Sequence, residues 1–151
     1  MPSIAPAVLP PGPTDVPADS PALGRGRSLT DYVSAFALDL LLLRGRDVLE
    51  VAAGPSSFVA EACARRIDAV AVDPAYDLPP AALAARWGRA GRAMGGTASD
   101  AEWRSSVERF LADYEASYCR GRYVWGGLPQ LPFFDGTFDL RCSPRATSCC
   151  G

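Results

Sequence analysis

The sequence predicts an α/β fold, a doubly wound parallel sheet with helices between successive strands. Short apolar runs alternate with longer segments whose apolar residues recur at helical spacing. The first two runs, 47–51 and 68–72, each carry an acid at or just beyond the carboxyl end. A turn of small residues, 52–57, joins the first run to the next helical segment, which is typical of a parallel strand that feeds a helix.

The first 27 residues are expected to form a disordered arm. Half of the 14 prolines fall within residues 1–22, mixed with Ala, Ser, Asp and Gly. Such a segment buries too little apolar surface to offset the entropy that it loses on ordering. It has neither the basic start nor the apolar core of a secretory signal, so we expect a cytoplasmic protein with reduced cysteines.

The folded region is expected to begin with a helix over 28–43. Ser28 or Thr30 suits its N-cap, and Gly45 lies just past the last apolar position, where a helix stops. The apolar face consists of Tyr32, Val33, Phe36, Leu40 and Leu43.

Two strands then flank one helix. The strands are predicted over 47–51 and 68–72 and the helix over 58–66, and Pro74 ends the second strand because it cannot continue a sheet ladder.

A helical region follows over 80–120. The first helix is predicted over 81–94, and a capping box, Ser99-Asp-Ala-Glu102, opens a second and longer one. The apolar stripe of the second helix is Trp103, Val107, Phe110, Leu111, Tyr114 and Tyr118. Because this stripe is continuous and amphipathic, we expect it to pad the sheet rather than to form a lid or a substrate cage.

The last two strands are expected at 122–125 and after the next turn, where residues 138–140 begin the fourth strand. Asp135-Gly136 makes the turn before the second of them. The predicted order 3-2-1-4 is the N-terminal half of a doubly wound sheet.

Composition limits the chemistry. With 15 basic and 17 acidic residues, the charge gives no reason to expect a nucleic-acid or membrane partner, and no apolar run is long enough to span a bilayer. The absence of histidine removes the most common general base. Cys63 and Cys119 are expected to face the core, and the spacing of the C-terminal cysteines predicts no metal site.

The chemistry-bearing residues surround the turn 52–57. Glu50 and Asp73 fall at the ends of adjacent strands, Gly54 permits close backbone approach, and free N–H groups at a helix start bind carboxylates. Together they predict a pocket for a nucleotide-like ligand. The alternative is that both acids only cap solvent-facing strand ends.

The segment from Glu50 to Ser56 resembles the glycine-rich motif of class I S-adenosylmethionine-dependent methyltransferases, an acid followed by three small residues at alternate positions. Gly54 is the middle glycine, whereas Ala52 and Ser56 replace the other two. Separately, Leu131-Pro-Phe-Phe-Asp-Gly-Thr-Phe-Asp-Leu140 is similar to the stretch that leads into strand four of many small-molecule members.

The resemblance covers 28–140 and implies a Rossmann-like domain, S-adenosylmethionine as cofactor, and methyl transfer to a small-molecule acceptor. The residues that it places at the cofactor are Glu50, Ala52, Gly54, Ser56, Asp73, Pro74 and Tyr76. In that arrangement Glu50 organises the methionine amino end, Asp73 accepts hydrogen bonds from the ribose, and Tyr76 flanks the adenine or ribose. The family's acid after strand three is missing from Gly126-Gly127-Leu128-Pro129, and no catalytic residue is assigned.

Two alternatives remain open: a non-catalytic S-adenosylmethionine-binding or scaffold half-domain, and a nicotinamide-dependent oxidoreductase. The second lacks its G-x-G-x-x-G fingerprint. The resemblance stops where Pro144 and two arginines replace an apolar strand, so we expect 141–151 to be a frameshifted, non-native tail and the domain to be truncated. Genomic DNA that continues in the same frame to a supported stop would contradict this expectation.

Overall fold

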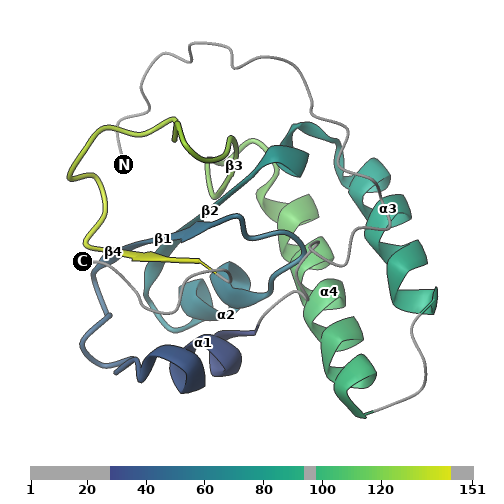
Figure 1. The fold of residues 1–151 in the computed structure, drawn as a ribbon, viewed down its shortest axis with the longest axis horizontal. Helices are drawn as coiled ribbons and strands as arrows, with labels where there is room; N and C mark the ends of the chain where they lie inside the picture. Colours follow the sequence, from purple (N-terminus) through teal and green to yellow (C-terminus); the bar gives the residue numbers. More distant parts are fainter. Residues whose placement is uncertain (1–27, 94–97, 144–151) are drawn as a thin grey trace.

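The computed structural model describes residues 28–93 and 98–143, and its centre is one parallel sheet (Figure 1). The strands are β1 (Asp47–Val51), β2 (Asp68–Asp73), β3 (Tyr123–Trp125) and β4 (Leu140–Cys142). They are hydrogen-bonded in the order β3-β2-β1-β4, and every pairing is parallel. The predicted α/β class and strand order are therefore confirmed. The expected arm 1–27 and the cysteines Cys149 and Cys150 lie outside the described residues.

The described helices all pack on one face of this sheet. They are α1 (Leu29–Phe36), α2 (Phe58–Ala64), α3 (Pro80–Ala93) and α4 (Ala98–Ser117), with a short 3₁₀ turn, η1 (Pro74–Asp77), directly after β2. Their buried side chains join one apolar cluster with Val48, Ala69 and Ala71 of the sheet. The opposite face carries Leu49, Val51 and Val72, which pack against Leu131, Phe133 and Phe138 of the β3–β4 connection. This connection runs on the side of the sheet away from α1 and α2 (Figure 1).

Helix α1 ends earlier than the sequence predicts. It begins as expected, since the Ser28 side chain accepts a hydrogen bond from the Asp31 N–H and the Asp31 carboxylate accepts one from the Ser28 N–H. It ends at Phe36, because Ala37 adopts a left-handed conformation (φ 50°). Asp39 then accepts a hydrogen bond from the Leu41 N–H at 2.9 Å, a local turn that competes with continued helix. The predicted extension to 43 is therefore wrong.

Helix α4 places most of its predicted stripe in the core. Trp103, Val107, Phe110 and Tyr114 are buried, whereas Tyr118 is 41% exposed, beyond the end of the helix. Cys119 is also exposed, so the expectation that it faces the core is wrong. The chain has already left the helix there, and Cys119 has a positive φ of 66°.

Strand β4 begins later and extends further than predicted. It starts at Leu140 and continues through Arg141 and Cys142, which pair with Leu49 and Glu50 of β1. Cys142 is 1% exposed, so these two residues of the expected non-native tail belong to the sheet. Residues 144–151 lie outside the described part of the chain. Across the described residues, no helix has the length and apolar character required to span a membrane.

Candidate functional site

The sheet changes direction between β1 and β4. The chain passes from β1 to β2 and β3 on one side, and β4 then returns to pair on the other side of β1. In open parallel sheets, ligands bind beyond the carboxyl ends of the strands at such a switch point. Here the carboxyl ends of β1 and β2 bring together Glu50, the turn 52–57 and Asp73.

The turn after β1 is open above Gly54. Ala52 and Gly54 both adopt left-handed backbone conformations, with φ of 55° and 57°. A Cβ built at Gly54 would meet no atom of the described residues within 4 Å, apart from the residue's own chain neighbours, so the structure leaves space for a ligand beside the backbone at this point. Ala52 adopts the left-handed conformation at a strain cost of about 1 kcal/mol. A glycine at position 52 would adopt it without this cost.

Residues from the end of β2 hold both backbone groups of Gly54. The Asp73 carboxylate accepts one hydrogen bond from the Gly54 N–H and another from the Ala75 N–H, each at 2.9 Å. The Tyr76 hydroxyl donates to the Gly54 carbonyl at 2.6 Å. The two contacts with Gly54 fix the turn, and the contact with Ala75 orients the Asp73 carboxylate. The sequence did not indicate this structural role for Asp73 and Tyr76.

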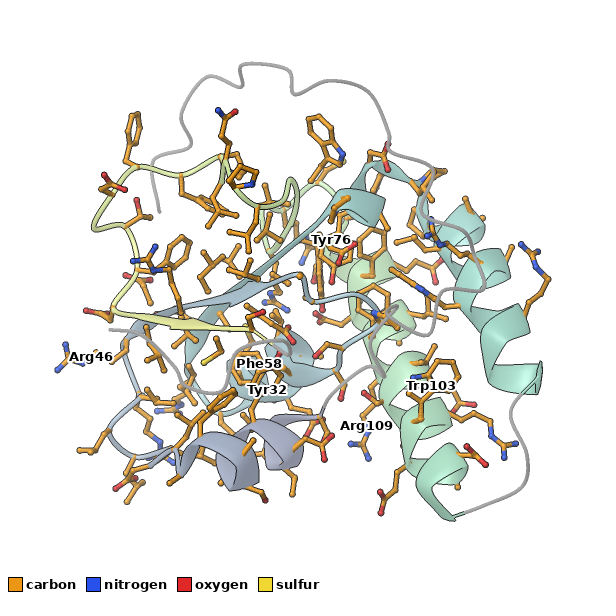
Figure 2. The ribbon with its side chains drawn as sticks, in the orientation of Figure 1. Tyr32, Arg46, Phe58, Tyr76, Trp103 and Arg109 are labelled. Atoms are coloured by element: carbon orange, nitrogen blue, oxygen red, sulfur yellow. The ribbon has the colours of Figure 1, made fainter. Side chains whose placement is uncertain are left out.

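Tyr76 lies inside the aromatic core. The residue, labelled in Figure 2, is 5% exposed. Its ring packs against those of Phe110, Tyr114 and Tyr123, with centroid separations of 5.9, 5.6 and 5.5 Å. In this position the ring is not available to stack on a ligand. Pro74 is exposed at the same edge of the sheet, beside Gly127.

Glu50 is fully buried on the helix-covered face. Its register neighbours are Ala71 and Cys142, and neither carboxylate oxygen has a hydrogen-bond partner of standard geometry within the described residues. Burial raises the pKa of Glu50 to about 8, because a buried carboxylate loses its hydration. The hydroxyls of Ser56 and Tyr32 oppose this rise, and the charge of Asp73 adds to it. Glu50 is therefore mostly protonated at neutral pH.

Helix α4 supplies a residue that the sequence did not assign to this region. The Ser106 hydroxyl accepts a hydrogen bond from the Ser57 N–H at 3.3 Å and donates one to the Ser57 hydroxyl at 2.9 Å. The Ser56 hydroxyl in turn accepts from the Phe58 N–H. Backbone donors that were expected to be free for a ligand are thus held by serines. The available signal was a serine on the apolar face of α4, between Trp103 and Phe110.

The structure brings Glu50, Ala52, Gly54, Ser56 and Asp73 to one turn. Comparison of the chain with protein-family models, with curated proteins and with solved structures finds no match.

Proposed function

We propose that this chain binds S-adenosylmethionine at the carboxyl edge of β1 and β2 and belongs to an enzyme that transfers its methyl group to a small-molecule acceptor. The observation that supports the proposal most strongly is Glu50, a fully buried acid that lies next to the turn 52–57 at the sheet's switch point and is not neutralised by any basic side chain of the described residues. A buried acid of this kind is destabilising by itself, which favours a role in binding.

The donor set fits the two polar ends of this ligand. The ligand's ammonium group would favour the ionised form of Glu50, which burial disfavours. The Asp73 carboxylate accepts one N–H bond at each oxygen, and carboxylate oxygens at a strand end are also suitable acceptors for ribose hydroxyls. When bound, S-adenosylmethionine supplies an activated methyl group. The protein then contributes mainly orientation, so the absence of histidine does not oppose this chemistry.

Isothermal titration calorimetry with S-adenosylmethionine and S-adenosylhomocysteine tests the binding step, with NADH as the comparison ligand. We expect binding of the two sulfur ligands and none of NADH. Binding of NADH alone would favour the oxidoreductase alternative, and no binding of any of the three by the folded protein would overturn the proposal.

We expect Gly54→Ala to weaken S-adenosylmethionine binding about tenfold or more. The added methyl group would contact no other part of the described structure within 4 Å, but it would project into the space through which the ligand would reach the turn. Gly121→Ala is a matched control, because Gly121 also has a positive φ, 77°, and an unobstructed Cβ position, but it precedes β3 at the opposite edge of the sheet. Both variants should lose similar stability, about 1 kcal/mol. Equal affinity of the two variants would contradict this placement of the ligand.

A further inference from the structure

A second candidate site lies at the amino edge of the sheet, away from the turn that follows β1. It is a hollow of about 330 Å³ lined by Arg44, Ala64, Arg65 and Arg66. Arg44 is shortly before β1, and Arg66 is shortly before β2. Because parallel strands begin at the same edge, the hollow is at the opposite end of the strands from Glu50 and Asp73.

The three arginines of the hollow are exposed, and none forms an ion pair with a carboxylate in the described part of the chain. Elsewhere arginines do find such partners. Arg122 pairs with Asp113 at 2.9 Å, and Arg109 approaches Glu61 at 3.5 Å. Three like charges around one hollow repel one another, so this arrangement gains from a bound anion.

The backbone holds the two arginine-bearing segments together. The Gly45 N–H donates to the Arg66 carbonyl at 3.3 Å, which ties the loop before β1 to the end of α2. The Arg65 guanidinium donates through Nη1 to the Glu61 carbonyl at 3.0 Å. This contact orients Arg65 and satisfies one helix carbonyl, but it leaves most of its donors available.

Arg66 occupies a backbone position that favours glycine. Helix α2 ends in a Schellman motif, in which the Ile67 N–H donates to the Ala62 carbonyl and the Arg66 N–H to the Cys63 carbonyl, each at 3.1 Å. Arg66 takes the left-handed position of this motif, with φ of 63°. An arginine there costs about 1 kcal/mol relative to glycine, and such strain accumulates at functional sites. The attraction of cations to a helix C-terminus does not require this residue, because Arg65 already provides it.

We propose that Arg44, Arg65 and Arg66 form a binding site for a phosphorylated small molecule, most suitably one with a diphosphate group. Guanidinium groups present forked donors that match phosphate oxygens. Three positive charges also balance the several negative charges of a diphosphate. This site is independent of the function proposed above, because S-adenosylmethionine carries no phosphate.

Isothermal titration calorimetry of the full chain with inorganic pyrophosphate, at low and at physiological ionic strength, tests the site. We expect saturable binding that weakens with salt. Arg66→Gly should reduce the affinity about tenfold or more while leaving the melting temperature unchanged or higher, because it relieves the left-handed strain. Arg44→Gln should reduce the affinity by a similar factor. Arg89→Gln, an exposed arginine on α3, removes the same charge elsewhere and should change the affinity less than twofold.

Several results would overturn this proposal. An unchanged affinity for pyrophosphate in Arg66→Gly, or an equal loss of affinity in Arg89→Gln, would show that the arginines of the protein attract anions only in a general way and form no specific site. A lower melting temperature in Arg66→Gly would give Arg66 a structural role instead. If the protein binds a short DNA duplex but not pyrophosphate, the ligand of the arginine site is a polynucleotide and not a small molecule.

Discussion

Replacing Glu50 by glutamine is expected to increase the free energy of unfolding by about 3 kcal/mol at pH 7. The pKa of Glu50 is about 8 in the folded chain and 4.5 as its ordinary value, so between these pH values the unfolded chain releases a proton that the folded chain retains. Stability therefore falls with rising pH across this window, by about 1.4 kcal/mol per pH unit, and the fall ends above pH 8. Glutamine has the same shape as the protonated acid and does not ionise.

Urea denaturation of both proteins at pH 5, 7 and 8 measures this effect. The advantage of the Glu50→Gln variant should be small at pH 5 and should grow at each higher pH. Asp68→Asn is a suitable control, because Asp68 is exposed at the start of β2. A constant difference between Glu50→Gln and the parent at all three pH values would show that Glu50 is ionised, or solvated, in the folded chain.

Replacing Phe110 by alanine is expected to lower the free energy of unfolding by about 4 kcal/mol, the typical cost of removing a buried phenylalanine. The Phe110 side chain is fully buried between the two long helices and the sheet. Its ring packs at 5.3 Å from Trp87 and at 5.5 Å from both Tyr114 and Tyr123. Its loss would leave a cavity at the centre of the aromatic cluster.

The Phe110→Ala variant also tests whether α4 packs permanently in the core or acts as a movable lid. Tyr118→Ala removes an aromatic ring near the end of α4 that is 41% exposed, and it should cost about 1 kcal/mol or less. Chemical denaturation monitored by far-ultraviolet circular dichroism measures both values. If Phe110→Ala costs no more than Tyr118→Ala, then α4 does not contribute to the core, and a lid becomes the better interpretation of the 80–120 region.

The sequence predicted the order of strands and helices because their signals are local. The runs 47–51 and 68–72 are short and mostly apolar, with clear turn residues after them, and the structure places strands there. The end of α1 was harder to predict. Leu40 and Leu43 continue the helical spacing and do pack against the core, but they do so from a turn, so periodicity alone did not distinguish the two cases.

The sequence predicts which residues lie near one another at the candidate site, but not the hydrogen bonds that they form. Glu50, Gly54 and Asp73 were placed correctly at adjacent strand ends, since parallel register follows from topology. The partners of these residues depend on side-chain directions that the sequence does not determine. The Asp73 carboxylate accepts from the Gly54 N–H, and Ser106 reaches Ser57 from a helix 49 residues away in sequence. Contacts across such separations require the packed structure.

The position of β4 affects the order in which the sheet assembles. Its approach to β1 is anchored by the Asp47 N–H, which donates to the Asp139 carboxylate across 92 residues, whereas β1 and β2 pair across a much shorter stretch that includes α2. Closing the longer loop costs about 1 kcal/mol more in chain entropy. The β1–α2–β2 unit is therefore expected to form before β4 joins it. Substitutions in β4 should then act mainly on the unfolding rate and leave the folding rate nearly unchanged.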